Sequence, residues 1–180
     1  EIRAIYEDRL GDLWIGTLGG LHQYRDGKLT ALTQENGLSD NQVKCILEDK
    51  EGNTWIGTGN GLNRYDRTTG KFELFTKERG LSGNTIRFIY EDRGGGLLIG
   101  TDAGLDRISG GVITAEWYTA GDGDYVVECA FEDKEGMLWL GTDRGLILAM
   151  RKTGVPPAQA SRGCLTENQG LTILEDDRGY

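Results

Sequence analysis

Apolar and polar residues alternate along this chain in short runs that are separated by glycine-containing turns. In the second quarter of the chain, such runs lie at 43–48, 53–58, 62–65 and 71–76. Alternation with a period of two residues is typical of half-buried β-strands. Gly52, Gly61 and Gly70 lie in the connections, where glycine supplies the backbone conformations that tight turns need. The pattern therefore predicts four short strands joined by turns.

The same pattern occurs four times in register. Its first half is IRAIYEDRLGDLWIGT from Ile2, VKCILEDKEGNTWIGT from Val43, IRFIYEDRGGGLLIGT from Ile86 and VECAFEDKEGMLWLGT from Val127. The aspartate of each Glu-Asp pair recurs at intervals of 41 or 43 residues, and ILEDDRGY at the end of the sequence starts a fifth copy. No run keeps an apolar period of 3.6 residues, which excludes a helical solenoid.

Repeats of this length with four short strands each are typical of β-propeller blades. We therefore predict an all-β fold, a β-propeller segment of about four four-stranded antiparallel blades that is part of a larger ring. The blades span approximately residues 1–40, 41–83, 84–124 and 125–170, and residues 171–180 begin a fifth inner strand. Because strand edges and blade faces would stay open, we expect that the segment does not persist as an isolated soluble monomer.

Composition narrows the functional classes. The 180 residues include 29 glycines and only 2 prolines, and the net charge is −9. That charge disfavours binding to nucleic acids and to anionic membrane surfaces. The three cysteines show no C-x-x-C spacing, so we predict neither a disulfide framework nor a zinc site. His22 is the only histidine and is interpreted as a surface strand residue, and we expect no metal and no cofactor.

Two repeated features suggest chemistry but are better explained by blade architecture. Trp14, Trp55 and Trp139 share one strand position, where the third copy has Leu98, and we predict that they wedge between neighbouring blades. A Glu-Asp pair begins a turn in every copy; the aspartates are Asp8, Asp49, Asp92 and Asp133. Paired carboxylates perform acid–base catalysis in enzymes, but four identical pairs around a ring do not converge on one substrate. We predict structural roles for both sets and no catalytic residues.

Candidate ligand-binding residues lie where the copies differ. In a propeller, the loops that precede the innermost strands and the loops between the second and third strands open on the same face. The latter loops contain Asn60, Asp102 and Arg144. One position of the first strand, nearest the axis, holds the charged residues Arg3, Lys44, Arg87 and Glu128. We predict that these residues bind a polar or anionic ligand; the alternative is an ordinary solvated channel.

The second copy carries its motifs in a specific order. They are Glu48-Asp49, Trp55-Ile56-Gly57-Thr58, Gly61-Leu62-Asn63-Arg64-Tyr65, Gly70-Lys71-Phe72 and Gly80-Leu81-Ser82. This order strongly resembles the two-component regulator propeller repeat, and the resemblance covers residues 1 to about 150. The third copy departs from the repeat at Leu98 and Ile108, and the fourth departs after Met150.

The resemblance implies a biological context. Members of that family form multi-bladed propellers in the extracytoplasmic, periplasmic sensor region of bacterial membrane signalling proteins, and their ligands are commonly carbohydrate breakdown products. The repeats of the family contain no catalytic residues, so any kinase or cyclase activity would lie outside this segment. We therefore expect a non-catalytic sensing or binding module of a two-component signalling protein.

The expected partners follow from the same resemblance and from the composition. They are a carbohydrate or other small polar ligand, together with further blades or a second chain that completes the ring. We expect no nucleic acid and no direct membrane contact. Two alternative functions stay open: a structural or oligomerising scaffold, and a propeller-fold lyase, which would require a catalytic histidine with acidic partners.

Overall fold

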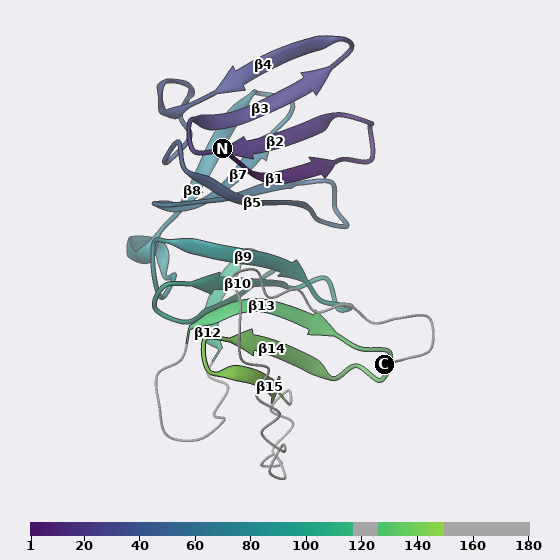
Figure 1. Ribbon diagram of the computed structural model, residues 1–180, viewed down its shortest axis with the longest axis vertical. Coiled ribbons are helices and arrows are strands. Elements are labelled where there is room, and N and C mark those ends of the chain that lie inside the picture. The colour runs from purple at the N-terminus through teal and green to yellow at the C-terminus, as the bar shows by residue number, and fades with distance from the viewer. Residues whose placement is uncertain (117–125, 150–180) are drawn as a thin grey trace.

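The computed structural model describes residues 1–116 and 126–149, which form four antiparallel sheets (Figure 1). The first sheet contains β1 (Ile2–Glu7), β2 (Leu13–Thr17), β3 (Gly20–Arg25) and β4 (Lys28–Leu32). The second contains β5 (Val43–Glu48), β6 (Thr54–Thr58), β7 (Gly61–Asp66) and β8 (Lys71–Phe75). The third contains β9 (Ile86–Glu91), β10 (Leu97–Thr101), β11 (Leu105–Ser109) and β12 (Val112–Glu116). The fourth contains β13 (Val127–Glu132), β14 (Leu138–Thr142) and β15 (Gly145–Ala149).

Strands that are consecutive in sequence are neighbours in every sheet, so each sheet is an up-and-down meander. This arrangement confirms the predicted all-β fold built of four antiparallel blades. The expected outer strand of the fourth blade and the fifth strand start at 171–180 lie outside the described residues. Two short 3-10 turns, at Gln34–Asn36 and Lys77–Arg79, lie in the segments that cross between blades and were not predicted. Within the described residues, no helix is long and apolar enough to cross a membrane.

The innermost strands of successive sheets lie next to one another. β1 contacts β5, β5 contacts β9, and β9 contacts β13. Figure 1 shows the sheets fanning out from these four strands, with β4 and β15 at opposite ends of the stack. This fan is the geometry of propeller blades around a common axis.

The turn after each innermost strand is organised by the repeated aspartate. Asp49 Oδ1 accepts hydrogen bonds from the backbone N–H groups of Glu51 and Asn53, at 3.0 and 2.8 Å. Its other oxygen accepts a 2.7 Å bond from Trp55 Nε1. The short aspartate side chain thus accepts backbone N–H groups of the turn, as a backbone carbonyl would do elsewhere. It also holds the indole of the next strand in place.

The same pairing occurs in the first and fourth blades. Trp14 Nε1 donates to Asp8 at 2.6 Å, and Trp139 Nε1 donates to Asp133 at 2.7 Å. In the third blade the side chain of Leu98 has no N–H group. Asp92 instead forms an ion pair with Arg107 on β11, the strand next to β10. The aspartate therefore has a charged or polar partner in all four blades.

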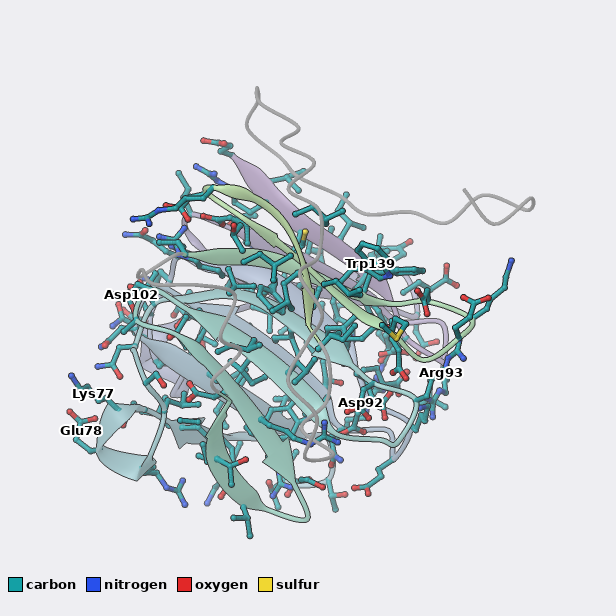
Figure 2. All side chains as sticks on the ribbon, turned by 90° about the horizontal axis from the view of Figure 1, so that it is seen from below. Lys77, Glu78, Asp92, Arg93, Asp102 and Trp139 are labelled. Atoms are coloured by element: carbon teal, nitrogen blue, oxygen red, sulfur yellow. The ribbon has the colours of Figure 1, made fainter. Side chains whose placement is uncertain are left out.

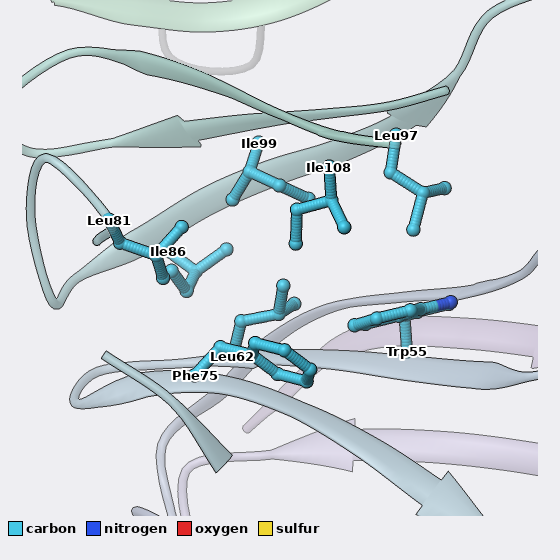
Figure 3. Packing of buried hydrophobic residues seen from close by; sticks show 8 residues of the cluster. All are labelled: Trp55, Leu62, Phe75, Leu81, Ile86, Leu97, Ile99 and Ile108. Atoms are coloured by element: carbon cyan, nitrogen blue, oxygen red, sulfur yellow. The ribbon is translucent and has the colours of Figure 1, made fainter. Parts of the chain in front are cut away.

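Three hydrophobic clusters lie between neighbouring sheets. The first joins sheets one and two and contains Trp14, Leu21, Leu38, Val43 and Ile56. The second joins sheets two and three (Figure 3) and contains Trp55, Leu62, Phe75, Leu81, Ile86, Leu97, Ile99 and Ile108. The third joins sheets three and four and contains Phe88, Leu98, Leu105, Val127, Leu138 and Leu140. Apolar burial therefore acts mainly between blades, and Trp14, Trp55 and Leu98 at the repeated strand position contribute to it.

The repeated Ile/Leu-Gly-Thr sequence has a packing reason. A Cβ atom on Gly57 would lie 2.6 Å from Cγ2 of Ile86, on the innermost strand of the next blade. A Cβ atom on Gly16 would lie 2.5 Å from Cγ1 of Val43, on the next blade in the same way. Glycine at this strand position lets the following blade approach the backbone closely.

Candidate ligand-binding face

The loop between the second and third strands of each blade lies beside the segment that leads into its first strand. Gln42 O accepts a 3.0 Å bond from Gly59 N, and Thr85 O accepts a 3.0 Å bond from Asp102 N. Val126 O accepts a 3.1 Å bond from Asp143 N. We call the surface formed by these loops and lead-in segments the loop face.

A threonine fixes the backbone of every loop on this face. The Oγ1 atoms of Thr17, Thr58, Thr101 and Thr142 donate to the carbonyl three residues ahead, at 2.8 to 3.0 Å. The same four atoms accept the N–H group two residues ahead, at 3.0 to 3.2 Å. The residues that donate these N–H groups are Gly19, Asn60, Ala103 and Arg144. One backbone conformation therefore presents a different residue in each blade, and three of the four residues carry a side chain.

The loop face lies opposite the aspartate turns. Figure 2 shows Asp102 at one edge of the molecule and Asp92 with Arg93 at the other. The turn that contains Asp92 and the loop that contains Asp102 are joined by β10, which separates the two ends of the blade. The loop face is thus separated from the interactions of the turns.

The structure pairs some of the predicted ligand-binding residues with each other or with neighbours. Arg87 on β9 donates from Nη1 to Glu128 on β13 at 2.6 Å. Arg3 lies 3.2 Å from a carboxylate oxygen of Glu1. Asp102 Oδ1 accepts a 3.2 Å bond from Thr85 N, so this carboxylate joins its loop to the segment that leads into β9. The predicted ring of charges is partly neutralised within the protein.

The remaining candidates present polar groups to solvent. Asn60 and Arg144 are exposed, and Lys44 is half-buried on β5. Within residues 1–116 and 126–149, these three side chains have no hydrogen-bond or ion-pair partner. They are the candidates on this face that remain available to a ligand.

Sequence reasoning missed a set of hydrogen bonds between blades at the opposite end. Glu48 accepts the backbone N–H of Arg9 at 2.8 Å, while the Arg9 guanidinium donates to the carbonyls of Asp49 and Lys50 at 2.9 Å each. Glu91 accepts the N–H of Lys50 at 3.1 Å, and Glu132 accepts that of Arg93 at 2.9 Å. The signal in the sequence was the full triplet Glu-Asp-Arg/Lys, of which only the first two residues were interpreted.

A second missed feature fixes the segment that crosses between blades. Asn63 Oδ1 accepts a 3.0 Å bond from Ser39 N, and Asn63 Nδ2 donates to Ser39 Oγ at 2.8 Å. Asp106 occupies the same position of the third blade and accepts bonds from Ser82 N at 2.8 Å and Ser82 Oγ at 2.6 Å. Burial raises the pKa of Asp106 above its usual 3.8, although the bonds from Ser82 oppose that shift. We call this pairing the crossing latch.

His22 occupies the latch position of the first blade. It is half-buried rather than a plain surface residue, and its Nδ1 atom is buried without a hydrogen-bond partner among the described residues. The same part of the chain contains no group of three His, Cys, Asp or Glu side chains that could hold a metal ion.

Charged side chains also join the first two blades at the turn end. Arg67 of the second blade forms ion pairs with Asp8 and Asp12 of the first. Arg25 donates from Nε to Asp12 at 2.7 Å, and this bond is the main reason that the pKa of Asp12 lies below its usual 3.8. These groups stabilise the blade interface and lie away from the loop face.

The family described as two component regulator propeller matches residues 1–19, 37–60, 80–103 and 121–144, just over half of the chain. Each of these segments contains one copy of the Ile/Leu-Gly-Thr sequence that begins a loop of the loop face. A search of curated protein sequences returns no match.

Solved structures of extracellular domains are similar to this chain. The domain of the hybrid two-component system BT4673 from B. thetaiotaomicron has a TM-score of 0.73 and 30% identity, over 87% of this chain and 21% of that one. The domain of BT3049 from the same organism has a TM-score of 0.72 and 23% identity, over 98% of this chain and 26% of that one. The chain therefore spans about a quarter of the length of the solved domains it matches.

Virginiamycin B lyase from Staphylococcus aureus also has a similar structure. The TM-score is 0.63 and the identity is 18%, over 82% of this chain and 52% of the lyase. At this identity the similarity shows the fold alone. The lyase alternative thus receives no residue-level support from the comparison.

Proposed function

Because this chain belongs to the two-component regulator propeller family, we propose that it is a non-catalytic binding module in the extracytoplasmic sensor region of a bacterial signalling protein. The extracellular domain of 30% identity supports this location, which in a bacterium with two membranes is the periplasm. Signal output would then belong to other parts of the signalling protein.

The loop face supports the binding role. Its four loops share one hydrogen-bonded backbone, yet they present glycine, asparagine, alanine and arginine at the same position. A scaffold needs only the shared backbone, whereas a binding site needs different side chains at defined places. This combination is the observation on which the proposal rests.

The chemistry of the available side chains indicates the ligand class. The Asn60 amide can donate and accept hydrogen bonds, as the hydroxyl groups of a sugar require. The Arg144 guanidinium can bind a carboxylate through two parallel hydrogen bonds, and Lys44 adds a further positive charge. We infer that the ligand is a carbohydrate or another small polar molecule, with an acidic sugar as the best fit.

A thermal-shift screen tests this proposal. Neutral oligosaccharides and oligosaccharides that contain uronic acids are added to the intact sensor region that contains this chain. A ligand at 100 times its Kd stabilises the folded protein by about 2.7 kcal/mol, and the Tm rises accordingly. We expect such a shift with an acidic oligosaccharide and its loss in the variants Asn60→Ala and Arg144→Ala.

Glu135→Ala is the matched control, because Glu135 is exposed on an aspartate turn at the opposite end of its blade. This variant should keep the full ligand-induced shift. If no oligosaccharide or small anion stabilises the chain, or if the control loses the shift as well, the binding role is contradicted and the scaffold alternative is preferred.

A further inference from the structure

The innermost strand of every blade contains a β-bulge next to the loop face. The pairing of β5 with β6 skips Lys44, and the pairing of β9 with β10 skips Arg87. Glu128 on β13 and Arg3 on β1 are skipped in the same way. A bulge redirects a side chain and is common next to binding sites. The extra residue of each bulge is thus charged, and it lies at the end of the strand that meets the loop face.

The bulged residues of adjacent innermost strands are within reach of one another. Arg87 and Glu128 occupy the same repeat position of β9 and β13, and Arg87 Nη1 donates to Glu128 Oε1 at 2.6 Å. β5 lies next to β9 in the same way, so Lys44 and Arg87 are neighbours. Like charges on neighbouring strands repel each other. Among the described residues, Glu128 is the only carboxylate that pairs with either of these two cations.

The ion pair between Arg87 and Glu128 is weak. Their side chains are 32% and 40% exposed, and an ion pair that water reaches contributes little to stability. In this conformation Nε of Arg87 is buried and has no hydrogen-bond partner among the described residues. A buried N–H group without an acceptor costs free energy. A different acceptor for the guanidinium can therefore compete with Glu128.

Contact between blades does not require this ion pair. β5 packs against β9 although Lys44 and Arg87 carry the same charge at the bulge position. A buried hydrophobic cluster joins those two blades instead. A similar cluster joins the third and fourth blades, where Arg87 meets Glu128. The need to hold blades together thus does not explain the pair.

We propose that Lys44 and Arg87 form a carboxylate-binding subsite of the loop face, and that Glu128 occupies Arg87 until an acidic ligand displaces it. This inference rests on the proposed function and adds to it the place of one acidic group and its internal competitor. The ligand carboxylate accepts hydrogen bonds from the Arg87 guanidinium and from Lys44 Nζ, while Glu128 turns to solvent. Arg144, which is exposed, stays available for another acidic group of the same oligosaccharide.

The exchange at Arg87 makes the site selective. A carboxylate of the ligand replaces the carboxylate of Glu128, so Arg87 keeps a negative partner throughout. A neutral sugar offers only hydroxyl groups, which accept weaker hydrogen bonds from a guanidinium than a carboxylate does. Glu128 therefore disfavours neutral ligands at this subsite, since such a ligand must leave one charged group without its partner.

Calorimetric titration of the intact sensor region that contains this chain tests the proposal. Trigalacturonate and other uronic-acid trisaccharides are the probes, each compared with its neutral, carboxyl-reduced counterpart. We expect Glu128→Gln to lower the Kd of an acidic trisaccharide by roughly fivefold, because the competitor is removed. The Kd of the neutral counterpart should not fall.

A double-mutant cycle separates competition at Arg87 from a general effect of charge. Arg87→Ala should raise the Kd of the acidic trisaccharide by about tenfold, and Lys44→Ala should raise it as well. In the Arg87→Ala background, Glu128→Gln should have no further effect, because Glu128 acts through Arg87. Glu135→Gln is the matched control: it removes the same charge from an exposed turn at the other end of the blade and should leave the Kd unchanged.

Each outcome decides the proposal. A Kd that Glu128→Gln does not lower, or lowers equally in the Arg87→Ala background, overturns it. Binding of acidic trisaccharides that is insensitive to Lys44→Ala and Arg87→Ala also overturns it but leaves the proposed binding function intact. Binding that occurs only in the Glu128→Gln variant supports it, since Glu128 then blocks the subsite completely. No binding to either protein overturns both this proposal and the binding function.

Discussion

Asn63 and Asp106 form the crossing latch with different chemistry at the same position. Asn63 supplies one acceptor and one donor to Ser39, while Asp106 supplies only acceptors to Ser82. Asp106 is 0% exposed, so its charged form lacks water as well as a neighbouring positive charge in the latch. The latch thus needs a short polar side chain but does not need a charge.

Replacing Asp106 by asparagine should therefore stabilise the protein at neutral pH. The folded-state pKa of Asp106 is raised, mainly by burial, so its cost is largest when the pH is above that pKa. As the pH falls toward the ordinary value of 3.8, the carboxyl becomes protonated in the folded state and the cost disappears. We expect Asp106→Asn to gain about 1 kcal/mol at pH 8 and little at pH 4, measured by urea denaturation.

The reverse change is the control. Asn63→Asp buries a carboxylate at a latch that has none, and it removes the 3.3 Å bond from Asn63 Nδ2 to Ile56 O. It should lose stability at pH 8 and recover part of the loss at pH 4. A stability difference that is independent of pH in both variants would contradict the electrostatic explanation.

At the scale of the strand, glycine decides how closely two blades approach. β6 contains Gly57, which has no Cβ atom and so leaves room for Ile86 of the next blade. A Cβ atom added to Gly57 would lie 2.6 Å from Cγ2 of Ile86. Gly19, in the loop between β2 and β3, has only Thr17 Oγ1 near its hypothetical Cβ, at 3.8 Å. Its equivalents in the other blades carry side chains, which agrees with the available space.

We expect Gly57→Ala to destabilise the protein by about 1–3 kcal/mol, because the added methyl group overpacks the interface between the second and third blades. Gly19→Ala should change the free energy of unfolding by less than about 1 kcal/mol, and it can be slightly stabilising through the unfolded state. Denaturant titrations of both variants measure the difference. Equal effects would show that the repeated glycine is not required by packing.

At the scale of the whole molecule, stability depends on the interfaces between blades. The hydrophobic clusters join neighbouring sheets, and the bonds of Arg9, Lys50 and Arg93 cross between blades. A molecule of this kind behaves approximately as a row of units that interact with their nearest neighbours. The cost of a mutation should then depend on whether an interface covers the position.

Ile86 and Ile2 provide a direct comparison, since they occupy the same repeat position. Ile86→Ala removes a buried side chain from the interface between the second and third blades and should cost about 3 kcal/mol. Ile2→Ala removes a side chain that is 60% exposed and should cost about 0.5 kcal/mol. Chemical denaturation of the two variants tests this, and similar costs would refute the interface explanation.

Much of the fold could be predicted from the sequence, and less of the candidate site. The four strands of the second blade were predicted to within about two residues, because alternation and turn glycines are local signals. The partners of Arg87 and Asp102 were not predicted, since the positions of Glu128 and Thr85 relative to them depend on folding. Among the predicted ligand-binding residues, Lys44, Asn60 and Arg144 are those whose side chains form no hydrogen bond or ion pair with the described residues.

The sequence by itself determined the repeat, the strand order within a blade and the family, because these depend on residues that are near one another in the chain. Only the tertiary structure decided what the repeated polar residues bind. Glu48 meets Arg9 across 39 residues, and Asn63 meets Ser39 across 24. Such contacts depend on the distance between blades, which close packing at Gly16 and Gly57 sets.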